Sequence, residues 1–175
     1  VYEGEWKNDK MNGIGVSRFN DGSMYEGDYK DGNIHGRGVY RFTSGNVYAG
    51  DFENAKKEGK GTMTYIDGRV YEGEWKDDII NGLGKITYNG NVYEGEWKNG
   101  KMNGQGKMTY SSGHVYEGEW KNGIKNGQGK MTYSNGDVYE GEWKNDKRNG
   151  RGVSRLNNGS MYEGDYKDGN IHGRG

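Results

Sequence analysis

The sequence predicts an all-β protein, an elongated single-layer antiparallel array of β-hairpin repeats, from three observations. The first is composition: hydrophobic residues make up only 29% of the 175 residues, whereas a protein with an ordinary packed core has about 45–50%. Aromatic residues nevertheless reach 13% and the net charge is only -1, which argues against a disordered chain. The second observation is a short internal period, and the third is the placement of aromatic residues and glycines within it.

A Tyr-x-Gly-x-aromatic motif recurs every 23 residues, with one step of 22. In a typical copy, residues 116–138, two short alternating runs (YEGEWK and GKMTY) are separated by turn residues, which predicts one hairpin per repeat. We expect a single repeat array over residues 1–175 with an incomplete last copy, cut from a longer protein and containing fifteen strands. The repeats begin at Tyr2, Tyr25, Tyr48, Tyr71, Tyr93, Tyr116, Tyr139 and Tyr162.

Strand alternation divides each repeat into an aromatic face and a charged face. Tyr116, Gly118 and Trp120 share one face, while Glu117 and Glu119 share the other. The glycine between the two rings predicts a notch in which a neighbouring repeat's ring lies close to the backbone. Because a one-layer sheet cannot cover both of its faces, we expect the aromatic face to be an exposed stripe.

Two kinds of turn are predicted between repeats. Residues 110–114 (YSSGH) indicate a type I turn followed by a glycine in a G1 bulge, whereas Asn89-Gly90 indicates a two-residue turn. Loss of the bulged residue preserves side-chain alternation, so we expect the 22-residue copy to stay in register.

Residues that could carry chemistry have simpler structural explanations. Glu-x-Glu pairs such as Glu117/Glu119 recur beside lysines, which predicts cross-strand ion pairs rather than acid–base catalysis. Residues 28–33 lack the oxygen spacing of a calcium loop, and His35, His114 and His172 lie at turn positions. The sequence has no phosphate-binding loop, no Ser/His/Asp set and no cysteine. We therefore predict no catalytic residue, no metal site and no cofactor, and hence no enzyme.

Charge and hydropathy exclude two further classes of function. Lys+Arg 25 against Asp+Glu 26 leaves no basic field, so we expect no nucleic-acid partner. No apolar run reaches the roughly 18 residues that a membrane-spanning helix needs. Without cysteines or a secretory signal, a cytoplasmic location is expected.

The segment YEGEWKNGKMNGQGKMTYSSG is similar to the repeat of MORN (membrane occupation and recognition nexus) proteins, and the resemblance covers the whole chain. It implies a single-layer antiparallel ribbon with an aromatic-lined groove. Proteins of this family serve as scaffolds or docking arms in cytoskeletal, ciliary and membrane-contact assemblies, sometimes attached to enzymes. The copies that begin at Tyr25, Tyr48 and Tyr162 depart most from the pattern, because Asp and Tyr or Phe replace Glu and Trp.

The first functional hypothesis is a non-catalytic scaffold that docks a helix or linear peptide in the aromatic groove, within a cytoskeletal or ciliary assembly. Four consecutive copies carry Trp, and we expect them to form the strongest segment. The predicted groove residues are Trp75, Trp97, Trp120, Trp143, Trp6, Tyr29, Phe52, Tyr166, Tyr71, Tyr93, Tyr116 and Tyr139. The alternative for the same residues is that the rings only pack on one another.

Two other hypotheses remain open: a peripheral phosphoinositide-binding module, and the regulatory arm of an enzyme whose catalytic domain lies outside these residues. The best cluster for lipid contact is Lys56, Lys57 and Lys60, but Glu53 and Glu58 lie beside it, so we expect membrane binding to be weak. Open strand edges at the ends, above all an unpaired strand within residues 162–175, predict fraying or self-association.

Overall fold

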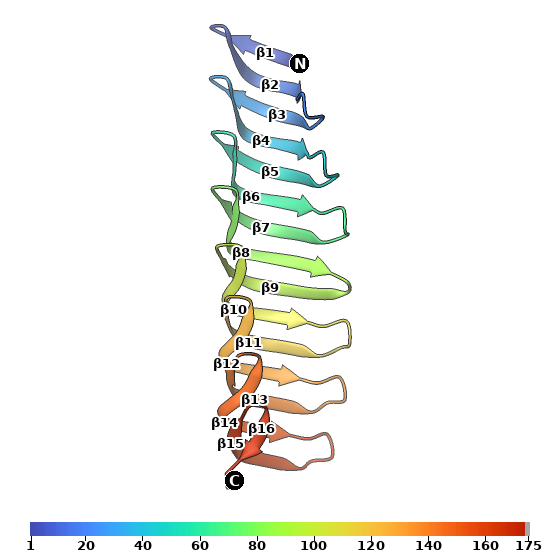
Figure 1. Ribbon diagram of the computed structural model, residues 1–175, viewed down its shortest axis with the longest axis vertical. Coiled ribbons are helices and arrows are strands. Elements are labelled where there is room, and N and C mark those ends of the chain that lie inside the picture. The colour runs from blue at the N-terminus through green and yellow to red at the C-terminus, as the bar shows by residue number, and fades with distance from the viewer. Residues whose placement is uncertain (174–175) are drawn as a thin grey trace. The chain divides into compact units, whose positions relative to one another are not determined.

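The computed structural model describes residues 1–173, and within them the regular structure consists of sixteen β-strands with no helix. The chain forms two compact units, unit 1 (Val1–Tyr88) and unit 2 (Asn89–Gly175). Within each unit the strands follow one another in chain order, and each pairs antiparallel with the next (Figure 1). The predicted class, all-β antiparallel hairpin repeats, is confirmed.

Each repeat supplies a short odd-numbered strand and a longer even-numbered strand, apart from the three-residue β16. Unit 1 contains β1 (Tyr2–Lys7), β2 (Lys10–Arg18), β3 (Met24–Lys30), β4 (Asn33–Arg41), β5 (Val47–Glu53), β6 (Lys56–Thr64), β7 (Val70–Lys76) and β8 (Ile79–Tyr88). Unit 2 contains β9 (Asn91–Lys98), β10 (Lys101–Thr109), β11 (Val115–Lys121), β12 (Ile124–Thr132), β13 (Val138–Lys144), β14 (Lys147–Arg155), β15 (Met161–Lys167) and β16 (Asn170–His172).

The prediction of fifteen strands, with an unpaired strand in residues 162–175, is wrong. Asp168 and Gly169 adopt positive φ angles of 51° and 93°, which makes a two-residue turn. This turn returns Asn170–His172 to β15, where His172 faces Asp165. A hairpin thus begins directly after its turn and needs only three residues to form a second strand.

The turns follow the predicted chemistry. Within hairpins, both central residues have positive φ, as at Asn122 (53°) and Gly123 (89°), and the backbone twist of such turns matches that of the strands they join. Between repeats, the N–H of Tyr110 donates to the carbonyl of His114 at 2.8 Å and Gly113 has a φ of 86°, which confirms the G1 bulge. Asn89 and Gly90 have φ angles of 48° and 75°, which confirms the two-residue turn.

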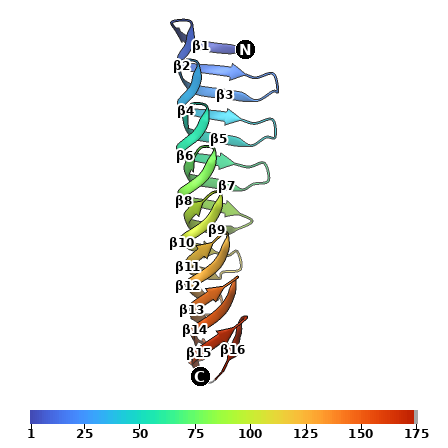
Figure 2. The same ribbon diagram turned by 60° about the vertical axis from the view of Figure 1, so that its left-hand side comes forward.

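Each even-numbered strand from β2 to β14 is bent by a bulge at the first glycine of its Gly-x-Gly motif. In the pair β11–β12, Gly118 faces Gly129, but Trp120 faces Lys125, so β12 carries two more residues than β11 between these pairs. Gly127 lies in the bulge with a φ of 109°, where a side chain would be strained. In unit 1 the even-numbered strands are curved at the ends that adjoin the two-residue turns. These ends therefore lie out of the plane of the odd-numbered strands (Figure 2).

The bulge also explains one half of the Glu-x-Glu pattern, which we had assigned to ion pairing. The carboxylate of Glu119 accepts the N–H of Gln128, which the bulge frees, at 2.8 Å. Only the first acid of the pair forms the predicted cross-strand ion pair, as Glu117 does with Lys107 at 2.8 Å. The second acid therefore satisfies the backbone rather than a lysine.

The core of each unit lies on the aromatic face. The leading tyrosines with no exposed surface are Tyr25, Tyr48, Tyr71, Tyr93, Tyr116 and Tyr139. The expectation of an exposed aromatic stripe is therefore wrong for the ring faces, because bent strands bring the rings of successive repeats into contact and the rings cover one another.

Candidate docking groove

The rings of each unit form what we call the aromatic ladder. Trp120 makes edge-to-face contacts with Tyr116 of its own repeat, with centroids 5.2 Å apart, and with Tyr93 of the preceding repeat at 5.3 Å. Such a contact contributes about 0.5–1.5 kcal/mol beyond burial. In unit 1 the ladder contains Tyr2, Trp6, Tyr25, Tyr29, Tyr48, Phe52, Tyr71 and Trp75; in unit 2 it contains Tyr93, Trp97, Tyr116, Trp120, Tyr139, Trp143, Tyr162 and Tyr166.

The leading tyrosines from Tyr2 to Tyr139 each lie over a pair of facing glycines. The hydroxyl of Tyr116 donates to the carbonyl of Glu119 at 3.0 Å. A Cβ on Gly129 would overlap the Tyr116 ring, and one on Gly118 would overlap the backbone of Gly129. The predicted notch therefore exists, but it holds the tyrosine of the same repeat, not a neighbour's ring.

In several repeats the second ring satisfies its polar tip inside the core, whereas Phe52 has no polar tip and Trp6 is 60% exposed. The indole Nε1 of Trp120 donates to the carbonyl of Gly106 at 3.2 Å. Where tyrosine replaces tryptophan, as at Tyr29, the hydroxyl donates to the Oγ of Ser17 at 2.6 Å. The aromatic ladder is consequently a satisfied core rather than a row of open contacts.

The predicted groove residues thus lie together on one face of each unit, but nearly all of them form its buried floor. Trp75, Trp120 and Trp143 are each 5% exposed, whereas Trp6 is 60% exposed because β1 pairs only with β2. A partner would meet the edges of these rings together with the side chains that flank them.

The flanking side chains come from a position that we did not single out in the sequence. It lies directly across each hairpin from the second ring, as Lys125 does from Trp120. We call this set the groove positions: Met11, Ile34, Lys57, Ile80, Met102, Lys125, Arg148 and Ile171. All are half-buried except the exposed Ile171.

Cations at three groove positions lie over the aromatic ladder. The Nζ of Lys125 lies 5.1 Å from the ring centre of Trp143 and 5.6 Å from that of Tyr116, and burial lowers the pKa of Lys125. The guanidinium of Arg148 lies 5.5 Å from the Tyr139 ring centre and 5.2 Å from that of Tyr166. Lys57 lies 5.5 Å from the ring centre of Trp75.

A cavity of about 460 Å³ adjoins Arg148 in unit 2. Tyr133, Val138 and Leu156 supply apolar walls, and polar groups come from His114, Ser134, Asn135, Asp137, Arg148 and Ser154. The Nδ1 of His114 accepts the N–H of Ser134 at 2.9 Å, which agrees with its expected place in a turn. The cavity combines apolar and hydrogen-bonding surface, as a site for a side chain requires.

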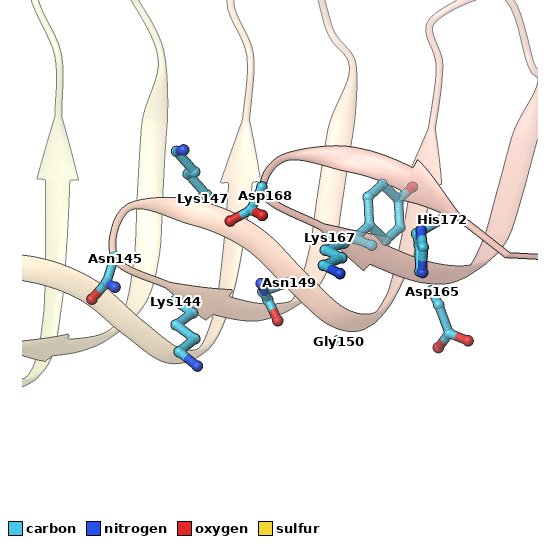
Figure 3. Close-up of a pocket in the computed structure, with 10 residues that line it drawn as sticks. Lys144, Asn145, Lys147, Asn149, Gly150, Asp165, Lys167, Asp168 and His172 are labelled. Carbon is cyan, nitrogen blue, oxygen red and sulfur yellow. The ribbon is translucent and has the colours of Figure 1, made fainter.

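A second cavity of unit 2, of about 540 Å³, has a mixed lining of both charge signs from β13 to β16 and their turns. Its lysines, Lys144, Lys147 and Lys167, point in different directions, Asp168 lies among them, and Asp165 lies near His172 (Figure 3). No common chemistry follows from this arrangement.

The three lysines considered for lipid contact do not form one cationic cluster. Lys56 and Lys57 are each paired with an aspartate at 2.8 Å, Asp77 and Asp78 respectively. Lys57 lies over the aromatic ladder, whereas the exposed Lys60 faces Glu74 across β6 and β7.

Residues 1–173 contain no group of three His, Cys, Asp or Glu side chains placed to hold a metal ion. In the same part of the chain, no helical segment combines the length and apolarity that crossing a bilayer requires.

The fold and its groove define a protein of β-hairpin repeats. The MORN repeat family matches the chain eight times, at residues 2–24, 25–47, 48–68, 71–91, 93–115, 116–138, 139–161 and 162–175. These matches begin at the eight leading tyrosines. The chain belongs to the MORN repeat family.

A search of curated proteins finds no significant match, but solved structures are similar to this chain. The TCP domain of Drosophila melanogaster SAS-4 (dCPAP), solved with a proline-rich motif of Ana2 (dSTIL), has 12% identity and a TM-score of 0.53, with 86% of this chain and 83% of that chain covered. The TCP10 domain of Danio rerio CPAP, solved with a STIL peptide, has 12% identity and a TM-score of 0.35, with 94% and 84% covered. At 12% identity and a TM-score of 0.53, the likeness to the SAS-4 domain concerns the fold alone.

Proposed function

We propose that this chain is a non-catalytic docking module that binds a helix or linear peptide along the groove of its aromatic face. The observation that carries the proposal is that buried and half-buried side chains on that face have different roles. The aromatic ladder is a fully satisfied core, while the groove positions beside it leave apolar and cationic side chains half-buried. Half-buried side chains above a rigid aromatic floor are typical of a peptide-binding groove.

The comparison with SAS-4 supports the proposal, since that domain has a related fold and was solved in complex with a proline-rich motif. The carboxylates of the charged face have structural partners, as Glu117 pairs with Lys107 and Glu119 accepts the backbone N–H of Gln128. Three further statements stay predictions. They are a cytoplasmic location in a cytoskeletal, ciliary or centriolar assembly, self-association through strand edges, and a role as the regulatory arm of an enzyme.

The absence of cysteine from the sequence allows a direct test. Peptides would be selected from a random library on the whole chain, and their affinities measured after a single cysteine is coupled to a bulky maleimide. Met102→Cys places the label in the groove, and Lys107→Cys places it on the charged face of the same strand, β10.

We expect the label at position 102 to weaken peptide binding at least about tenfold, and the label at position 107 to leave it unchanged. Circular dichroism and thermal unfolding of both labelled proteins control for the fold. Equal affinities in the two labelled proteins would show that peptides bind elsewhere, and the proposal would be wrong.

A further inference from the structure

We infer that the groove of unit 2 is selective for an acidic helix, whose carboxylates bind at Lys125 and Arg148. This inference rests on the proposed docking function and names the chemistry of its partner. It starts from the charge on the aromatic face. Within residues 1–173, the ladder rings, the glycines between them and the second-strand residues opposite the leading tyrosines are all uncharged. The charged residues among the groove positions are all cations: Lys57, Lys125 and Arg148.

The three cations differ in how far the chain neutralises them. The Nζ of Lys57 donates to the Oδ1 of Asp78 at 2.8 Å. The charge of Lys57 is therefore neutralised by the chain itself. The Nζ of Lys125 lies 3.9 Å from the Oδ1 of Asp146, beyond hydrogen-bond distance, and this oxygen accepts the backbone N–H of Lys125 at 2.9 Å. Lys125 is therefore only weakly paired, although its side chain is just 13% exposed.

Arg148 has no carboxylate within 4 Å among the described residues. Its Nη2 donates to the carbonyl of Gly169 at 2.7 Å, and the rest of the fork lies over Tyr139 and Tyr166. A partly desolvated cation without an acidic partner is stabilised when a ligand brings one. Unit 2 thus presents, at equivalent positions of adjacent repeats, Arg148 without an acidic partner and Lys125 with only a weak one.

The cavity beside Arg148 adds donors suited to a carboxylate. The Oγ of Ser154 accepts from Tyr166 at 2.7 Å, so its own hydrogen is available to a ligand. The Nδ1 of His114 is an acceptor, so the proton of neutral His114 is on Nε2 and can be donated. The one acid in the lining, Asp137, uses Oδ1 to accept from the N–H of Asn157 and Oδ2 to accept from the Nδ2 of Asn135, each at 2.8 Å.

The spacing of the two cations favours a helix. Equivalent positions of adjacent repeats are two strands apart, about 9.6 Å at the usual strand separation. On a helix, residues seven apart lie on one side and are about 10.5 Å apart along the axis. An extended peptide places same-side residues about 6.8 or 13.6 Å apart, which fits less well.

The test uses two fluorescent helical peptides with an alanine and leucine background, one with two Glu residues seven apart and one with Gln at the same places. They are titrated against the whole chain and its variants. Lys125→Met and Arg148→Met are combined, because Met11 and Met102 occupy equivalent positions and show that methionine fits there. Lys57→Met is the matched control at a neutralised cation, and Lys125→Arg should retain binding.

We expect the double variant to lose at least about tenfold affinity for the Glu peptide, and Lys57→Met to change it little. The Gln peptide should bind about tenfold more weakly than the Glu peptide and be insensitive to the double variant. Equal binding of both peptides, still blocked by the label at position 102, would overturn the acidic preference and leave the docking function standing.

Two other results would overturn the acidic helix as the ligand altogether. Peptide binding that the label at position 102 does not block would contradict both the inference and the proposed function. Binding of phosphatidylserine vesicles that depends on Lys125 and Arg148, without binding of the Glu peptide, would replace the peptide with a lipid surface as the ligand.

Discussion

Two repeats fill the same interior space in different ways. In residues 116–138, Trp120 donates to the carbonyl of Gly106 at 3.2 Å, and the residue twelve positions before it is the buried Met108. In residues 25–47, Tyr29 occupies the corresponding place and donates to the Oγ of Ser17 at 2.6 Å. The smaller ring is accompanied by a smaller neighbour that also accepts its hydrogen bond.

The last repeat has the same Tyr and Ser arrangement, since Tyr166 donates to the Oγ of Ser154 at 2.7 Å. The two copies with tyrosine at the second ring therefore do not have a less satisfied core. A substitution at the second ring is matched by another residue twelve positions earlier, and the pair is the unit that should be tested.

The largest effect is expected for Trp120→Ala. Removal of a buried indole should lower the free energy of unfolding by about 3–5 kcal/mol, since Trp120 is 5% exposed. Trp6→Ala is the control, because the same position in β1 is 60% exposed. Denaturant unfolding measures both, and equal losses would contradict the burial that we describe.

A somewhat smaller loss is expected for Gly118→Ala. The new Cβ would overlap the Gly129 backbone across the hairpin, and overpacking of this kind costs about 1–3 kcal/mol or more. Gly123→Ala is the matched control, since no atom lies within 4 Å of its Cβ position and only the φ of 89° opposes a side chain there. If Gly123→Ala is the more destabilising, close approach of the two strands is not the reason for the glycine.

The Tyr and Ser pair is tested by Ser17→Ala, which leaves the hydroxyl of the buried Tyr29 without its acceptor. We expect a loss of about 1–3 kcal/mol. Tyr29→Phe in the same chain should recover much of that loss, because it removes the unpaired hydroxyl. Additive losses in the double variant would mean that the two side chains are not energetically coupled.

The smallest effect on stability is expected from the ionisation of the core tyrosines. It is absent near neutral pH and appears only in alkali. Burial raises the pKa of Tyr139 to about 12, above the ordinary value near 10 in the unfolded chain. A raised pKa in the folded state means that its contribution is fully present below pH 10 and is lost as the pH rises toward 12. Thermal unfolding at constant salt should show a melting temperature that falls through this window, and a flat profile would contradict it.

Much of this fold follows from the sequence because strand alternation and glycine chemistry are local. The faces of Tyr116 and Trp120, and both turn types, needed only neighbouring residues. The roles of Glu119 and Lys125 were missed because the segment KNGQG has the composition of a turn, so the second strand was predicted to begin near Gly129. It begins at Ile124. The bulge adds two residues and preserves alternation, so Lys125 lies on the same face as Met131.

Exposure could not be predicted in the same way. It depends on how far each hairpin bends, and this bend arises from the bulge and its buried backbone contacts rather than from alternation. The same rings that suggested a binding stripe instead supply the core, and the residues beside them are left to contact a partner.

Photocrosslinking tests the central claim, docking along the groove of unit 2, most directly. A Glu peptide with a benzophenone group would be irradiated with the whole chain, and the modified residues identified by mass spectrometry. Our account predicts crosslinks at Met102 and Tyr133, on the aromatic face. Crosslinks confined to Lys107, Lys121 and Lys130, on the charged face, would contradict it.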